Sequence, residues 1–277
     1  MNKMNELKTI TISVASGKGG VGKSNLTLNL GYFLYELNKK VLIIDCDLGL
    51  ANIDVLLGIT PKRNIKDLLS EEVRSKDIIV NLESTAHSLD LIPAASGIPE
   101  LLEYESEVQF ILTQKLNDIL NAYDFTLLDL GAGIHKSVLT FAASTDVRII
   151  IITPEPTSLT DGYALIKVLK NKYKLNNFFI LVNMVQNEKE ALVNFKRLCT
   201  ACKKFLNLEV SYLGFVREDK NLTQSVREQK LLAKIKPHSN FCLDLMEIAK
   251  KIVNISKQQV FPGKGLNLWE NKGEENE

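Results

Sequence analysis

The run Ala15–Asn25, ASGKGGVGKSN, places four glycines and two lysines in a short stretch whose residue types suit phosphate binding. Gly17, Gly22, Lys23 and Ser24 satisfy the pattern G-x-x-x-x-G-K-[S/T] of a phosphate-binding loop. Glycines let the backbone curl around a phosphate with its N–H groups inward, and a helix that begins there adds a favourable dipole. Lys23 would then neutralise the β- and γ-phosphates, and the Ser24 hydroxyl would coordinate Mg²⁺. The predicted nucleotide-binding residues of this loop are Gly17, Lys18, Gly19, Gly20, Val21, Gly22, Lys23, Ser24 and Asn25.

Three carboxylates, those of Asp45, Asp47 and Asp129, stand at or just beyond the ends of the apolar runs VLIID and FTLLDL. Asp45 and Asp47 are two residues apart, so in an extended chain they project to the same side. Open α/β sheets bind their ligands at the carboxyl ends of the strands, which is where all three carboxylates are expected. Another interpretation stays open for Asp45 and Asp47, in which the pair caps nearby backbone N–H groups.

The pattern of the whole chain predicts an α/β scaffold for these residues. Short apolar runs rich in β-branched residues alternate with stretches of helical period, which favours a doubly wound, mostly parallel sheet of seven or eight strands with helices on both faces. The predicted strands are residues 9–15, 41–45, 89–94, 125–130, 147–153, 178–183 and 210–216, and the predicted helices include 23–38, 108–121, 158–174, 188–206 and 239–256. We expect one domain, residues 1–258, and a tail, residues 259–277, that is loosely ordered or contacts a membrane or a partner.

The composition indicates the compartment in which the protein is expected. The 277 residues carry a formal charge of +1, which gives no overall attraction to nucleic acid or anionic lipid. The first residues lack the apolar core of a secretory signal, and no apolar run is long enough to span a bilayer. Four cysteines in a chain of this length do not suggest a disulfide framework. We therefore expect a cytoplasmic protein.

The second lysine of the loop, Lys18, points to a family. The run GKGGVGKS resembles the deviant Walker A motif of the MinD/ParA class of P-loop ATPases, whose extra lysine follows the first glycine. The resemblance implies that Lys18 reaches across the interface of an ATP-dependent homodimer to phosphates bound by the other subunit. Such a cation stabilises charge that builds up during phosphoryl transfer and makes catalysis depend on association. The alternative is that Lys18 is a solvated charge of the loop.

The same resemblance gives roles to the carboxylates. The run IIDCDLGLANIDVLLG resembles switch I of the class, which implies that Asp47 orients the attacking water and that Asp45 supports the Mg²⁺ shell. The run FTLLDLGAG resembles a Walker B strand leading into switch II, which implies that Asp129 holds Mg²⁺ through water. The implied cofactors are ATP and Mg²⁺. The implied catalytic residues are Asp47, Lys18 and Lys23, and the implied metal site consists of Ser24, Asp45 and Asp129.

The predicted base is adenine. The Asn-Lys-x-Asp element by which guanine-selective relatives bind their base does not occur here at a predicted strand end. Asn183, in LVNMV, stands where the adenine-contacting asparagine of the class is found, and its amide can both donate and accept hydrogen bonds. In the run VREDK, Arg217 takes the place of the proline of the family's Pro-Glu-Asp turn. The predicted purine contacts are therefore Asn183, Arg217, Glu218 and Asp219.

Two further runs, IPAASGIPEL at 92–101 and TPEPTSLTDGYALIKVLK at 153–170, resemble the FlhG branch of the class, also called FleN or YlxH, which regulates flagellar number and placement. The resemblance implies slow ATP hydrolysis, reversible membrane association of the dimer, and flagellar partners, namely the signal-recognition-type GTPase FlhF and switch-complex proteins. The residues before the first strand do not contain the Asp-Gln-Ala-x-x-Leu-Arg element of members that activate FlhF, so its stimulation is not expected. Residues 241–256 have a helical apolar stripe that core packing explains better than membrane contact.

Other readings compete with this one. A ParA-like DNA-partitioning ATPase and a scaffold that binds nucleotide without hydrolysing it stay open, although the charge of +1 makes nucleic acid an unexpected partner. An iron–sulfur relative of this fold would need cysteines near switch II, and the sequence has none between Cys46 and Cys199. Cys199 and Cys202 are expected to be neighbours on a helix rather than ligands of a metal.

Overall fold

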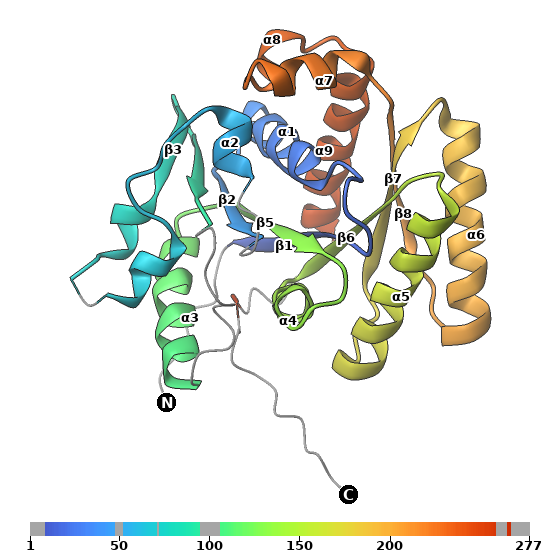
Figure 1. Cartoon of the computed structure of the whole chain (residues 1–277), viewed down its shortest axis with the longest axis horizontal. Helices are drawn as coiled ribbons and strands as arrows, with labels where there is room; N and C mark the ends of the chain where they lie inside the picture. The colour runs from blue at the N-terminus through green and yellow to red at the C-terminus, as the bar shows by residue number, and fades with distance from the viewer. Residues whose placement is uncertain (1–8, 48–51, 71, 95–105, 259–264, 267–277) are drawn as a thin grey trace, which may run out of the picture.

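A single eight-stranded sheet forms the centre of the molecule, and helices pack on both of its faces (Figure 1). The computed structural model describes residues 9–47, 52–70, 72–94, 106–258 and 265–266, with the side chains of residues 106–110 left out. The strands are β1 Ile10–Ser16, β2 Val41–Cys46, β3 Val80–Ser84, β4 Ser88–Ile92, β5 Phe125–Ala132, β6 Val147–Ile152, β7 Phe178–Val185 and β8 Ser211–Arg217. The helices are α1 Lys23–Glu36, α2 Ile53–Leu57, α3 Ser106–Leu120, α4 Lys136–Ser144, α5 Pro156–Tyr173, α6 Glu188–Leu206, α7 Lys220–Arg227, α8 Leu232–Ile235 and α9 Asn240–Gln258, with short 3₁₀ helices η1 Ile65–Leu69 and η2 Ser75–Ile78.

The order of the strands places β1 in the middle of the sheet. The order is β3-β4-β2-β5-β1-β6-β7-β8, and β1 pairs in parallel with both β5 and β6. The chain leaves β1 toward β2 on one side and later continues through β6, β7 and β8 on the other, so the winding reverses beside β1. Open α/β sheets bind ligands at the carboxyl ends of strands beside such a reversal.

Strands with long apolar runs are buried because helices cover both faces of the sheet. Every residue of β2 and of β6 is buried, as expected for strands between two layers of helices. Helices α1, α8 and α9 share one hydrophobic core with one face of the sheet, and α3 to α6 share a second core with the other. Figure 1 shows these two layers above and below the strands. The predicted doubly wound α/β fold is confirmed.

Some elements differ from the prediction. Strand β3 was not predicted. It lies at the edge of the sheet, pairs antiparallel with β4 and is only partly buried. Because an edge strand is partly exposed, its residues do not form the continuous apolar run that indicates a central strand. Helix α1 ends at Glu36 rather than Asn38, because Asn38 has a left-handed backbone with φ 62°. The short helices α2, α4, α7 and α8 were also not predicted.

Two residues of the predicted tail, 265 and 266, belong to the described chain. Leu266 is 1% exposed and packs in the core beside α3. The Asn117 side chain donates to the Leu266 carbonyl at 2.9 Å and accepts from its backbone N–H at 2.9 Å. Most of the 92–101 run lies outside the described residues, and the predicted division of the chain at residue 258 stays a prediction. Among the described helices none is long and apolar enough to cross a membrane.

Candidate nucleotide-binding site

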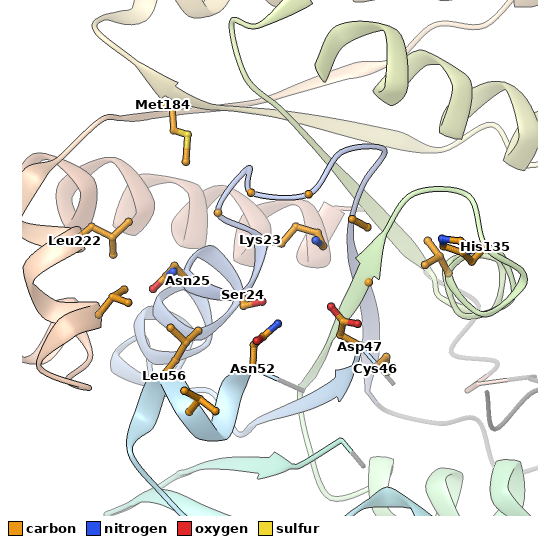
Figure 2. Close-up of a pocket in the computed structure, with 18 of the residues that line it drawn as sticks. Lys23, Ser24, Asn25, Cys46, Asp47, Asn52, Leu56, His135, Met184 and Leu222 are labelled. Carbon is orange, nitrogen blue, oxygen red and sulfur yellow. The ribbon is translucent and has the colours of Figure 1, made fainter. Parts of the chain in front are cut away.

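A cavity of about 860 Å³ lies at the carboxyl ends of β1, β2 and β5 (Figure 2). Its walls come from the glycine-rich loop and the start of α1, from the ends of β2 and β5, and from α2, α4, Met184 and α7. The lining residues are Gly19, Gly20, Gly22, Lys23, Ser24, Asn25, Cys46, Asp47, Asn52, Val55, Leu56, Gly131, Ala132, His135, Ser137, Val138, Met184, Leu222, Thr223 and Val226. A volume in this range accommodates a ligand of the size of a nucleotide.

The backbone of the loop is shaped for a phosphate. Gly20 and Gly22 have φ angles of 77° and 88°, left-handed conformations that glycine adopts without a steric penalty. Gly22 caps α1, so the unpaired N–H groups of the first helical turn face the cavity end of the helix. At Gly17 an added Cβ would collide with the backbone carbonyl of Asp161 on α5. The glycines are therefore needed both for the turn and for the close packing of the loop on α5.

Lys23 and Ser24 meet the carboxylate of Asp129 at the inner end of the cavity. Asp129 is 1% exposed and accepts a hydrogen bond from the Thr27 hydroxyl at 3.0 Å. Burial raises the pKa of Asp129 to about 6, against the opposing effect of a hydrogen bond from Ser24 and of the positive charge of Lys23. The structure thus brings together three of the residues that the sequence predicted for phosphate and Mg²⁺ binding.

Asp45 and Asp47 diverge after β2. Asp45 is buried and accepts backbone N–H bonds from Asp47 at 3.0 Å, Asn52 at 3.4 Å and Ile53 at 3.3 Å, which fixes the start of α2 on the end of the strand. Burial, together with the charge of Asp129, raises its pKa to about 7. The capping role that was left open for Asp45 is thus present, and its part in the metal site stays a prediction.

The side chain of Asp47 lines the cavity on the same side as Lys23 and Ser24 (Figure 2). Its carboxylate lies against the backbone of Gly131, where an added Cβ would be 3.3 Å from Oδ1 of Asp47. A carboxylate at this place, beside the loop that binds phosphates, can accept a hydrogen bond from a water molecule near the γ-phosphate. The geometry suits the predicted role of Asp47 in orienting the attacking water.

Lys18 points in another direction than Lys23. Its ammonium group pairs with the carboxylate of Glu155 and donates to the Thr157 hydroxyl at 3.1 Å, both at the start of α5. The side chains of Lys18 and Glu155 are 36% and 60% exposed. The residues that line the described cavity do not include Lys18. The two lysines of the loop therefore lie in different places, Lys23 inside the cavity and Lys18 on the surface beside it.

Asn183, on β7, binds the backbone of the glycine-rich loop. It is 3% exposed, and its Nδ2 donates to the carbonyl of Val21 at 2.8 Å. A Cβ on Gly22 would lie 2.7 Å from the same nitrogen. The next residue, Met184, has a left-handed backbone with φ 58° and lines the cavity. Asn183 thus fastens the loop to β7 in this structure, and its contact with adenine stays a prediction.

The purine contacts predicted at the end of β8 and just after it, Arg217, Glu218 and Asp219, bind other parts of the chain and are not among the residues that line the cavity. Arg217 donates twice to the carboxylate of Asp244 on α9, at 2.8 and 2.7 Å. Glu218 accepts from the side chain of Gln186 at 3.2 Å. Asp219 caps α7 through the backbone N–H of Asn221 at 2.9 Å and also accepts from Phe241 N at 3.3 Å. Their predicted purine contacts stay predictions.

Much of the cavity wall was in no site prediction. The missed residues of its outer part are Asn52, Val55 and Leu56 at the start of and within α2, Met184, and Leu222, Thr223 and Val226 from α7. The other missed lining residues are Cys46, Gly131, Ala132, His135, Ser137 and Val138. Asn52, Val55 and Leu56 fall within the run IIDCDLGLANIDVLLG, but no role was predicted for them, and the residues of α7 belong to no motif. Helices α2 and α7 are also far apart in the chain. The one available signal was position, since α2 follows the Asp47 segment and α7 follows the VREDK run.

Comparisons with known proteins agree on one class. The family model described as an AAA domain matches residues 9–181. The chain is 33% identical to the antiactivator FleN of Pseudomonas aeruginosa over 91% of this chain and 89% of the relative, and 39% identical to the flagellum site-determining protein YlxH of Helicobacter pylori over 90% and 84%. A solved structure of the septum site-determining protein MinD from Pyrococcus horikoshii, complexed with Mg-ADP, shares the fold with a TM-score of 0.73 at 24% identity, over 91% of this chain and 99% of that one.

Proposed function

The chain belongs to the MinD/ParA class of P-loop ATPases, close to FleN and YlxH, and from that premise we propose that it is a switch that dimerises with ATP and regulates the number or placement of flagella. Slow hydrolysis of the bound ATP would dissolve the dimer. The flagellar role is supported by the likeness to FleN and YlxH over most of the chain.

One observation carries the dimerisation part of the proposal: Lys18 lies outside the cavity of its own subunit, on the surface beside it. Its exposed pair with Glu155 is of the kind that contributes little to stability, so Lys18 can exchange Glu155 for a phosphate at small cost. Two large apolar side chains, Val55 and Ile134, are 61% and 51% exposed; Val55 lines the cavity, and Ile134 follows its residues Gly131 and Ala132. A second copy that covers this face would remove both from water.

The residues around Lys23 fit a Mg²⁺–nucleotide. Ser24 offers a hydroxyl oxygen at the cavity wall, and Asp129 stands directly behind it, which is the set of hard oxygen donors that Mg²⁺ prefers. When bound, Mg²⁺ would neutralise phosphate charge. Lys23 would hold the β- and γ-phosphates, Asp47 would orient the attacking water, and Lys18 of the second copy would stabilise the charge that develops on the γ-phosphate.

Partners of the ATP dimer are proposed from the same class resemblance. They are a flagellar signal-recognition-type GTPase, proteins of the flagellar switch complex, and a membrane surface that the dimer contacts reversibly. The number of flagella per cell in a Pseudomonas aeruginosa strain that lacks FleN tests this part. Expression of this chain should restore the normal count, and Lys23→Ala should not.

The direct test of the proposed mechanism mixes two inactive variants. Asp47→Ala binds ATP and donates Lys18 but cannot orient water, whereas Lys18→Ala binds ATP and keeps Asp47 but lacks the donated lysine. Each alone should release almost no phosphate. In a mixed dimer the site of the Lys18→Ala subunit is complete, so the mixture should recover up to about a quarter of the wild-type rate. That is the value for random pairing, and the recovery is smaller to the extent that Lys18→Ala pairs more weakly.

The mixing experiment also has a clear negative outcome. If Lys18 acted within its own subunit, the mixture would be as inactive as its components. If Lys18→Ala alone hydrolysed ATP at the normal rate, Lys18 would be a solvated charge of the loop, and the switch would have to work in another way.

A further inference from the structure

Two helices from distant parts of the chain face each other across the outer part of the cavity. Helix α2 contributes Val55 and Leu56, and helix α7 contributes Leu222 and Val226. Figure 2 shows Leu56 and Leu222 on the side of the loop opposite Asp47 and His135, with Met184 above them. Apolar side chains on two sides make a slot that suits a flat ring, whereas Lys23 and the loop glycines suit phosphates.

One side-chain hydrogen bond joins the segment that follows α7 to α2. The Nε2 atom of Gln229, in the turn between α7 and α8, donates to the carbonyl of Val55 at 2.8 Å. Gly58, which caps the end of α2, packs on the same side chain: an added Cβ there would lie 3.2 Å from the Cβ and the side-chain oxygen of Gln229. Gln229 thus occupies the carboxyl end of α2.

The two ends of this connection are themselves fastened to the nucleotide-binding core. The first N–H groups of α2 donate to the Asp45 carboxylate at the end of β2. On the other side, the backbone N–H of Ala233 in α8 donates to Asn29 of α1 at 2.9 Å. The bond from Gln229 to Val55 therefore closes a loop of contacts from β2 through α2 and α8 back to the helix that begins at Lys23.

We propose that Gln229 is a positioning residue that holds α2 and α7 together as a clasp around the base and ribose of the bound nucleotide. The inference rests on the proposed adenine-nucleotide site, and it names the residue that controls how fast the nucleotide leaves that site. Gln229 is exposed, so its hydrogen bond competes with water and contributes modestly, as a reversible closure should. The loop glycines and Lys23 bind the phosphates without help from the clasp.

The test compares Gln229→Met with Gln224→Met. Methionine keeps the length of glutamine but has no N–H donor, and both positions are exposed. Gln224 donates at 2.7 Å to Glu228 of the same segment, so its variant loses a similar surface hydrogen bond away from α2. Stopped-flow release of a fluorescent ADP analogue and competition by inorganic triphosphate measure base-dependent and phosphate-dependent binding separately.

The clasp predicts that Gln229→Met releases the ADP analogue about threefold to tenfold faster than wild type, with an unchanged affinity for inorganic triphosphate, and that Gln224→Met behaves as wild type. Equal release rates for Gln229→Met and wild type would overturn it. A parallel loss of triphosphate binding would also overturn it, because the residue would then support the fold of the whole site. A wild-type protein that binds triphosphate and no adenine nucleotide would refute the proposed function itself, and the clasp with it.

Discussion

Replacement of Glu155 by glutamine should strengthen the ATP-dependent dimer. In the structure Glu155 pairs with Lys18, the lysine that the proposed dimer needs at the opposite phosphates. Formation of one dimer breaks two such pairs, one in each subunit. Exposed ion pairs contribute about 0.2–1 kcal/mol each. Removal of both pairs before association should therefore favour the dimer by about 0.4–2 kcal/mol, which corresponds to a factor of about 2 to 30 in the dimerisation constant.

Sedimentation equilibrium of the Asp47→Ala background with ATP and Mg²⁺ measures this constant without loss of the nucleotide. The matched control is Glu247→Gln, which removes the same charge from an exposed pair with Lys250 on α9. It should leave the dimerisation constant unchanged. Because salt screens exposed pairs, the gain from Glu155→Gln should shrink between low and high ionic strength.

A weaker dimer for Glu155→Gln would contradict this reasoning, since the pair would then assist association. The same would follow from an equal gain for Glu247→Gln, because the effect would then reflect net charge rather than the release of Lys18.

Three further results are expected. Lys23→Ala removes a charged contact with the phosphates, so the dissociation constant for ADP, measured by calorimetric titration, should rise at least about tenfold; unchanged binding would remove Lys23 from the site. Gly17→Ala forces a methyl group against the carbonyl of Asp161, at a cost of about 1–3 kcal/mol of folding free energy. The melting temperature of this variant should therefore fall by about 2–10 °C. An unaltered melting curve would show that α5 can move away from the loop at no cost. Although burial opposes it, backbone N–H bonds from Asn221 and Phe241 hold the pKa of Asp219 below its usual range, so Asp219 stabilises the fold above about pH 4 and loses this effect as the pH falls further. The difference in melting temperature between wild type and Asp219→Asn should therefore shrink below that pH, and a constant difference would assign the stabilisation to another cause.

Local sequence was sufficient for the inner half of the site. The glycine-rich loop, Lys23, Ser24 and Asp129 lie on or beside β1, α1 and β5, and both strands are buried along nearly their whole length. Their meeting point follows from the carboxyl ends of parallel strands, which a sequence pattern can place.

The outer half depends on contacts that no local pattern records. Leu56 and Leu222 line one cavity because α2 and α7 both border it, although both helices are short and no sequence pattern places them side by side. Arg217 was predicted at the purine, but the structure pairs it with Asp244 on α9, and only the packing of α9 beside β8 reveals that partner. The edge strand β3 escaped prediction because half-exposed residues give no continuous apolar run.

Light scattering of the wild-type protein with Mg²⁺ and either ADP or a non-hydrolysable ATP analogue tests the central claim most directly. The account predicts the mass of one chain, 31.0 kDa, with ADP and twice that mass with the analogue, and a single-chain mass for Lys18→Ala in both. A wild-type protein that binds the analogue and still scatters as a single chain would contradict the claim that Lys18 acts across a dimer.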